Sequence, residues 1–122
     1  MSDALDWGRR QQAAREKWIA ISFYEVKIRR PDHIELRRYE RAGDDLDEAV
    51  VLRHVLDWRG ITEAHLAPGV GGEDLVPFAT FAWREWVGSR PDDFKAVAEA
   101  IVEEFKAHNA RREAVEGKSA ST

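Results

Sequence analysis

The chain has 122 residues and a formal net charge of −4 at pH 7, which fits a single domain with a thin core. It contains no cysteine, and this excludes disulfides, thiolate zinc sites and cysteine nucleophiles. No apolar run approaches the roughly 20 residues of a membrane span, and the N-terminus lacks the pattern of a signal peptide, so we expect a cytoplasmic protein.

The charge is divided unevenly along the chain. Residues 1–42 hold ten Lys or Arg and seven Asp or Glu, a net of +3, whereas residues 43–122 hold nine and sixteen, a net of −7. Opposite signs in the two halves favour head-to-tail self-association or a partner with a mixed surface. The alternative is that both halves are solvated helix faces.

Residues 1–17 form a polar N-terminal arm. Its composition favours a helix with Ser2 as N-cap, but it offers only Leu5, Trp7 and its alanines for burial, and Gly8 weakens it further. We expect a helix here that is frayed or depends on a partner.

The segment from Trp18 to Ile28 alternates with a period of two and is rich in β-branched and aromatic side chains. It is the one convincing strand signal in the sequence. Because a lone strand leaves its edges unpaired, it must bend into a two-stranded ribbon, pair with another copy, or take a strand from a partner.

Two helices follow. The first is expected from about Pro31 to Ala42, with Pro31 at its first position and Gly43 just after its C-cap. The second begins at the acidic residues 44–48, which suit a helix N-terminus, and continues through a run that is apolar almost all round. We expect this second helix to be the most buried one and to end at Gly60.

Residues 62–74 are rich in glycine, which is typical of a loop with mobility or a binding role. After this loop, Thr80 is placed to cap a short aromatic helix that Gly88 and Ser89 break. The last helix starts at Pro91 and carries the cleanest amphipathic stripe of the chain, whereas residues 111–122 are expected to form a disordered tail.

Together these elements predict a mainly α fold, a small bundle of about four short helices with a short N-terminal β segment or ribbon. The helical domain is expected to span residues 18–110, between the arm and the tail.

No catalytic, metal-binding or cofactor-binding signature is found in the sequence. The four histidines have no HxxxH or HxH pairing, and residues 44–48 lack the glycine and closing glutamate of a calcium loop. No Lys-Ser or Lys-Thr pair follows the glycines at 69–72, and no serine lies in a GxSxG turn. We therefore expect no metal, no cofactor and no enzyme activity.

Aromatic side chains gathered near the C-terminal helices are the strongest indication of a binding surface, because protein interfaces favour Trp, Phe and Arg anchors. The residues predicted to contact a partner are Trp58, Phe78, Phe81, Trp83, Trp86, Arg84 and Arg90. Burial of these rings in the core is the alternative.

Three short motifs resemble the small tail assembly chaperones of long-tailed phages, prophages and gene transfer particles. They are Ile28-Arg29-Arg30-Pro31 at the end of the extended segment, Leu56-Asp57-Trp58-Arg59-Gly60-Ile61 after the central helix, and Val76-Pro77-Phe78 before the C-terminal helices, which restart at Pro91. The resemblance covers residues 18–110. The long loop between Gly60 and Val76 and the polar arm depart from the family pattern.

The resemblance implies a protein without enzyme activity that coats the tape measure protein, keeps it soluble and helps recruit the tail tube protein. It also implies a place in the cytoplasm of the host cell and absence from the mature virion. Self-association is compatible with this role, which needs exposed apolar grooves between short helices.

The alternative from another class is a small phage or prophage nucleic-acid-binding regulator. Its contacts would be the doublets Arg9-Arg10, Arg29-Arg30 and Arg37-Arg38 in the basic first third of the chain, where aromatic residues are interleaved. The acidic net charge of the whole chain weighs against nucleic acid as a partner.

Overall fold

The computed structural model describes residues 3–120. The helices are α1 (Ala4–Ala13), α2 (His33–Arg41), α3 (Leu46–Arg53), α4 (Glu63–Leu66), α5 (Thr80–Gly88) and α6 (Pro91–Ala120), and the strands are β1 (Glu16–Ile21), β2 (Tyr24–Arg29) and β3 (Val55–Arg59). The mainly α prediction is confirmed. The small bundle of about four helices with a ribbon is not, because the described residues form six helices and a three-stranded antiparallel sheet.

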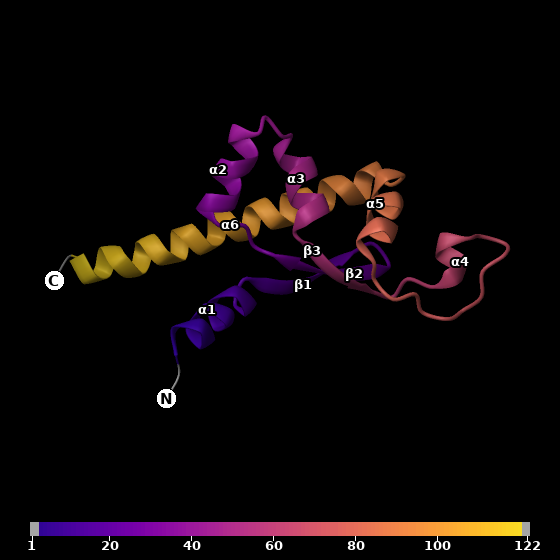
Figure 1. Ribbon diagram of the computed structural model, residues 1–122, viewed down its shortest axis with the longest axis horizontal. Helices are drawn as coiled ribbons and strands as arrows, with labels where there is room; N and C mark the ends of the chain where they lie inside the picture. Colours follow the sequence, from indigo (N-terminus) through magenta and orange to yellow (C-terminus); the bar gives the residue numbers. More distant parts are fainter. Residues whose placement is uncertain (1–2, 121–122) are drawn as a thin grey trace.

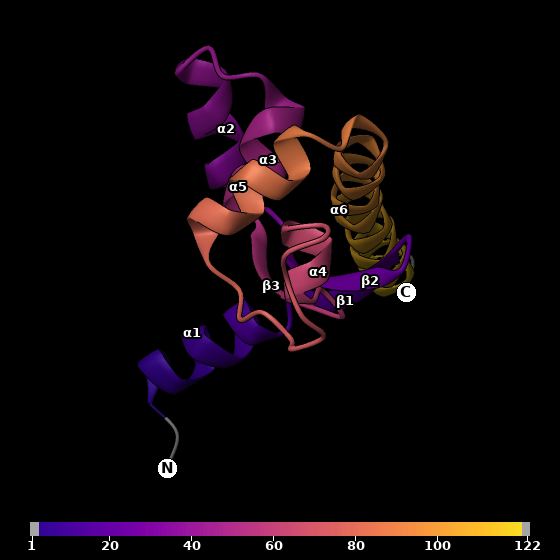
Figure 2. The ribbon, with the colours of Figure 1, turned by 90° about the vertical axis from the view of Figure 1, so that its right-hand side faces the viewer.

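The sheet has the strand order β1-β2-β3, and α3, α5 and α6 pack together over it (Figures 1 and 2). β1 and β2 form a hairpin whose last pair is Ile21 and Tyr24. Ser22 makes the turn with a φ of 55°. Of the three arrangements open to the extended segment, the bent ribbon is therefore the one that forms within the chain.

β3 corrects the prediction that the central helix continues to Gly60. α3 ends at Arg53, and β3 pairs with β2 in a register that places Trp58 opposite Val26. An apolar run rich in valine fits a buried helix and a buried strand equally well by pattern alone. The open edge of β2 decides between them, because pairing satisfies the backbone groups that the hairpin leaves free.

The caps of the middle helices follow from local sequence. Asp32 caps α2 in a capping box with Glu35, so Pro31 stands before the helix and not at its first position. Gly43 lies after the C-cap with a φ of 72°, as predicted. Asp45 caps α3, which agrees with the expected acidic start.

The structure at the N-terminal end of the chain agrees with the prediction, whereas the structure at the C-terminal end does not. α1 is exposed along its whole length, as expected for a polar arm, and Asp3 caps it, while Ser2 lies outside the described residues. α6 continues to Ala120, well past residue 110, where we expected a disordered tail to begin. Ion pairs of Arg111 with Glu104 and of Arg112 with Glu116 run along this part of the helix and stabilise it.

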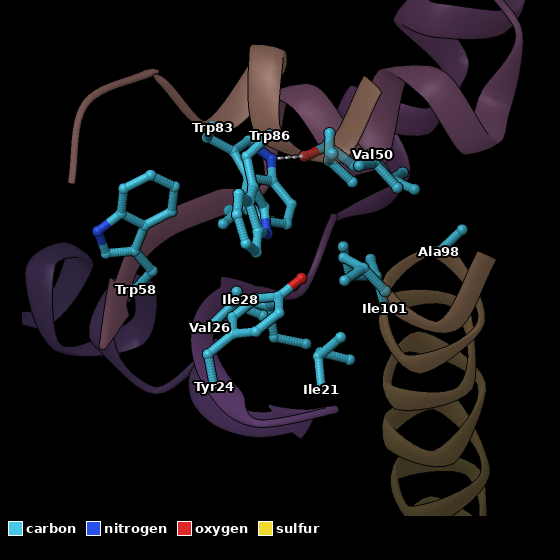
Figure 3. Close-up of a cluster of buried hydrophobic side chains, with 14 of the residues drawn as sticks. Ile21, Tyr24, Val26, Ile28, Val50, Trp58, Trp83, Trp86, Ala98 and Ile101 are labelled. Atoms are coloured by element: carbon cyan, nitrogen blue, oxygen red, sulfur yellow. Dashed lines mark hydrogen bonds between the residues drawn. The ribbon is translucent and has the colours of Figure 1, made fainter. Parts of the chain in front are cut away.

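The core lies between the inner face of the sheet and the helices above it (Figure 3). α5 begins at Thr80 and ends at Gly88, where its end was expected. Its N-cap is Ala79 and not Thr80, which corrects the prediction. Trp83 of this helix is fully buried among residues of β2, α3 and α6. α3 is the central helix, since Val50 and Val51 are both 0% exposed.

The connection between β3 and α5 is an ordered lobe, which we call the α4 lobe (residues 62–75). A bridge between Thr62 and Leu75 closes its base, and the Glu63 and Ala64 amides donate to carbonyls of the returning arm. A Cβ at Gly71 would collide with the Glu63 carbonyl, so the two arms approach as closely as they do only because this residue is glycine. The lobe projects from one end of the long axis of the molecule (Figure 1).

Candidate protein-binding surface

Three of the seven predicted contact residues lie in the core. Trp58, Trp83 and Trp86 are 4%, 0% and 8% exposed. The Trp58 indole donates to the Val76 carbonyl at 2.7 Å, and the Trp83 indole donates to the Val51 carbonyl at 2.8 Å. The expectation that these three rings contact a partner is therefore corrected, because a small domain needs its largest apolar side chains inside.

Phe78 and Arg90 are half-buried and serve the fold as well. Phe78 packs edge-on against Trp58 with ring centroids 5.6 Å apart. The Arg90 guanidinium lies 4.5 Å from the centroid of the Trp86 ring and 2.6 Å from the Asp93 carboxylate, which also accepts a hydrogen bond from the buried Tyr24 hydroxyl. Arg90 therefore links the start of α6 to the hairpin.

Phe81 and Arg84 are the two predicted residues that lie on an open surface. Phe81 is 75% exposed. Both side chains line a hollow of about 440 Å³ with Leu52 and Thr80, and an adjoining hollow of about 290 Å³ shares Leu52 and Arg84. We call the two hollows together the α3–α5 groove, and its apolar wall is formed by Leu52, Phe81, Val87, Pro91 and Phe94.

The lining of the groove is mainly apolar. Its charged groups are Arg84 and Glu48. Burying apolar side chains of a partner here releases water from both surfaces, which is favourable at about 25 cal/mol per Å². No pair of groups that activates a nucleophile or transfers a proton lines the groove.

Two groove residues were missed at the sequence level. Leu52 belongs to the helix that was expected to be the most buried, and Phe94 belongs to the last, amphipathic helix. Neither was predicted to contact a partner, and each is half-buried at the groove. A signal was present in α3, where residues 49–52 are all apolar and cover more of the helix surface than one packing face uses.

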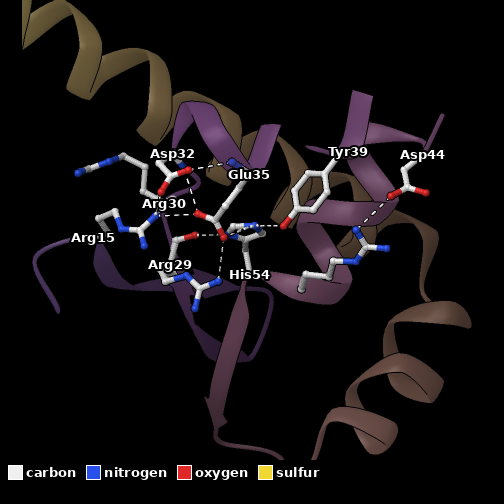
Figure 4. Close-up of polar contacts among 9 residues, drawn as sticks. Arg15, Arg29, Arg30, Asp32, Glu35, Tyr39, Asp44 and His54 are labelled. Atoms are coloured by element: carbon white, nitrogen blue, oxygen red, sulfur yellow. Dashed lines mark hydrogen bonds and ion pairs between the residues drawn. The ribbon is translucent and has the colours of Figure 1, made fainter. Parts of the chain in front are cut away.

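A polar network fastens α2 to the sheet (Figure 4). The Glu35 carboxylate accepts hydrogen bonds from Arg15 at 2.8 Å and from Arg29 at 3.1 Å. His54 donates from Nδ1 to the Arg29 carbonyl at 2.9 Å and accepts at Nε2 from the Tyr39 hydroxyl at 2.7 Å. Because both ring nitrogens are engaged and the ring is 0% exposed, His54 is structural and has no access to a substrate.

His54 makes the stability of the protein depend on pH. Burial lowers the pKa of His54 in the folded state, against smaller raising effects of the Arg29 carbonyl and Glu35. The unfolded chain then takes up a proton below about pH 6.5 that the folded chain does not, so stability falls with acidification at up to about 1.4 kcal/mol per pH unit.

We expect urea midpoints to decline from pH 7 to 5 in the wild type, and His54→Gln to be less stable at pH 7 but to show a flatter decline. An unchanged slope in the His54 variant would contradict the assignment of a buried neutral ring.

Among the described residues, no group of three or more His, Asp or Glu side chains is placed to hold a metal ion. Within residues 3–120, no helix has both the length and the apolar character needed to cross a membrane. No family model, no curated protein and no solved structure matches the chain.

Proposed function

We propose that the protein is a tail assembly chaperone that binds the tape measure protein of a phage or prophage, keeps it soluble and helps recruit tail tube subunits. The observation that carries this proposal is the α3–α5 groove, where Phe81 is 75% exposed beside an apolar wall. An exposed ring next to an apolar hollow forms a joint apolar patch, and a partner that covers both would remove this patch from water.

The shape of the groove favours a helical client. Helices of a partner bind in apolar grooves through side chains spaced three and four residues apart. The groove is shallow and made of few residues, which gives a modest affinity and allows the client to be released. A protein that coats a long helical client and leaves before the virion is complete needs this combination, and in this proposal it acts in the host cytoplasm.

Two of the motifs that resemble the chaperone family contact each other beside the groove. Trp58 lies in one motif and Val76 in another, and the indole of the first donates to the carbonyl of the second. Phe78 of the second motif packs on the same ring. These motifs support the loop that leads into α5, and α5 carries Phe81.

Phe81→Asp is expected to reduce binding of the client at least about tenfold, because it places a charge where apolar side chains would be buried. The test is co-expression with a tape measure fragment from the same genome, followed by co-purification and light scattering at low and high salt. Ile34→Asp on α2 is the matched control, since Ile34 is 67% exposed and lies away from the groove. A fragment that stays insoluble with the wild type, or equal binding by Phe81→Asp, would contradict the proposal.

A nucleic-acid-binding regulator is the second candidate, and the outer face of α2 favours it. Arg37, Arg38 and Arg41 line one exposed hollow with Ile34. Arg29 is not part of this surface, because Glu35 holds its guanidinium. Under this candidate, nucleic acid would co-purify and dissociate steeply with added salt, whereas an apolar client complex would tolerate salt.

A further inference from the structure

A cleft of about 500 Å³ lies between α1, the residues that lead into α2, and α6. We call it the α1–α6 cleft. The side chains that matter for its chemistry are Gln11, Arg30, His33, Phe105, His108 and Arg112. The residues that line the cleft belong to α1, to the segment before α2 and to α6. Figure 1 shows α1 and the C-terminal half of α6 on the side of the molecule away from α4.

The cleft carries more positive than negative charge, because Arg15, Arg30 and Arg112 line it with a single carboxylate, Asp32, which is paired with Arg15 at 3.4 Å. Among the described residues no carboxylate pairs with Arg30, and Arg112 is paired with Glu116 on its own helix at 4.0 Å. Burial, with Arg15 and Arg111 nearby, lowers the pKa of Arg30 below its usual range despite the opposing charge of Glu104. An anionic partner group would relieve this repulsion.

The α4 lobe has the opposite character. No Lys or Arg occurs from residue 60 to residue 83, while Glu63, Glu73 and Asp74 are acidic. Val70 is 89% exposed and Leu75 is 70% exposed. The lobe is thus an acidic protrusion with apolar side chains, and its backbone hydrogen bonds hold its shape before any partner binds.

We propose that the protein associates head to tail, with the α4 lobe of one copy bound in the α1–α6 cleft of the next. The acidic lobe residues would face Arg30 and Arg112, and the exposed apolar side chains of the lobe would cover Phe105 in the cleft. Because the two surfaces differ and lie on different sides of the molecule, the contact is heterologous and repeats as an open string. This association does not depend on the identity of a client.

Charge reversal on each surface tests the proposal. The cleft variant carries Arg30→Glu and Arg112→Glu, and the lobe variant carries Glu73→Lys and Asp74→Lys. The lobe should keep its shape because its hydrogen bonds use backbone atoms. A control variant with Arg37→Glu and Arg38→Glu reverses equal charge on the exposed face of α2. Circular dichroism melts confirm that each variant is folded before assembly is measured.

Sedimentation velocity over a range of concentrations at low and high salt is the measurement. We expect the wild type and the control to form concentration-dependent oligomers that high salt weakens, and each reversed variant to associate at least about tenfold more weakly. An equimolar mixture of the two reversed variants is expected to assemble again, because every contact then joins opposite charges.

Three outcomes would overturn the proposal. The first is a wild type that stays monomeric at every concentration tested. The second is a mixture of the two reversed variants that fails to assemble. The third is loss of the oligomers on nuclease treatment, which would show that nucleic acid bridges the copies.

Discussion

Trp83→Ala is expected to destabilise the domain by about 3–5 kcal/mol, the range measured when a buried aromatic residue is truncated to alanine. The ring is 0% exposed, is the largest of the fully buried side chains, and packs edge-on near Trp58 with centroids 6.4 Å apart. Truncation also leaves the Val51 carbonyl of α3 without its indole donor. A loss of this size is a large part of the 5–15 kcal/mol by which domains are usually stable.

Thermal unfolding followed by circular dichroism checks this prediction, with a drop in Tm of more than about 10 °C expected for Trp83→Ala. Phe81→Ala is the matched control on the same helix, because a ring that is 75% exposed contributes little to the core. Its Tm is expected to stay within a few degrees of the wild type. Equal losses in the two variants would show that Phe81 is buried. They would contradict the assignment of Phe81 to the exposed α3–α5 groove.

The contrast between these rings explains what the sequence predicted about the site and what it did not. Three-residue spacing groups Trp83 with Trp86 and groups Phe81 with Arg84 on the other side of α5. The prediction took both sets as one surface, although only one side of a short helix faces outward. Separating the two sides of the helix was possible from the sequence. The identity of the outward side depends on the tertiary packing of α3 and α6.

The sequence predicted the starts and ends of helices correctly where one or a few neighbouring residues determine the backbone conformation. Gly43 after α2, the acidic start of α3 and the break at Gly88 are of this kind, and each lies where it was expected. β3 was not predicted because residues 55–59 form a strand only by pairing with β2, which lies about thirty residues earlier in the chain. The long extent of α6 was missed because residues 111–117 are exposed and are helical through propensity and ion pairs such as Arg111 with Glu104.

Glu35→Ala is expected to cost about 2–4 kcal/mol, which is more than an ordinary ion pair contributes, because it leaves Arg15 and Arg29 without their shared carboxylate in a half-buried place. The same change removes the side chain that completes the capping box of α2 with Asp32. Burial alone would raise the pKa of Glu35, but the hydrogen bonds from Arg15 and the Asp32 backbone outweigh it and lower the pKa below its ordinary value.

The lowered pKa of Glu35 determines how the stability of the protein changes on acidification. A carboxyl that ionises more readily in the folded state adds stability above its unfolded pKa of about 4.3, and this contribution is lost as the pH falls through the folded value. Urea unfolding of Glu35→Ala is therefore expected to show a shallower loss of stability than the wild type below about pH 4.5.

Glu25→Ala is the control that separates burial from ion pairing. Glu25 accepts two hydrogen bonds from Arg59, at 3.1 and 2.9 Å, yet both side chains are solvent-exposed at the outer face of the sheet. Water screens such a pair, so its loss is expected to destabilise the protein much less than the loss of Glu35 does. Similar losses for the two glutamates would mean that the network around Glu35 is solvated in solution, and the attachment of α2 to the sheet would then rest on Tyr39 and the apolar contacts of α3.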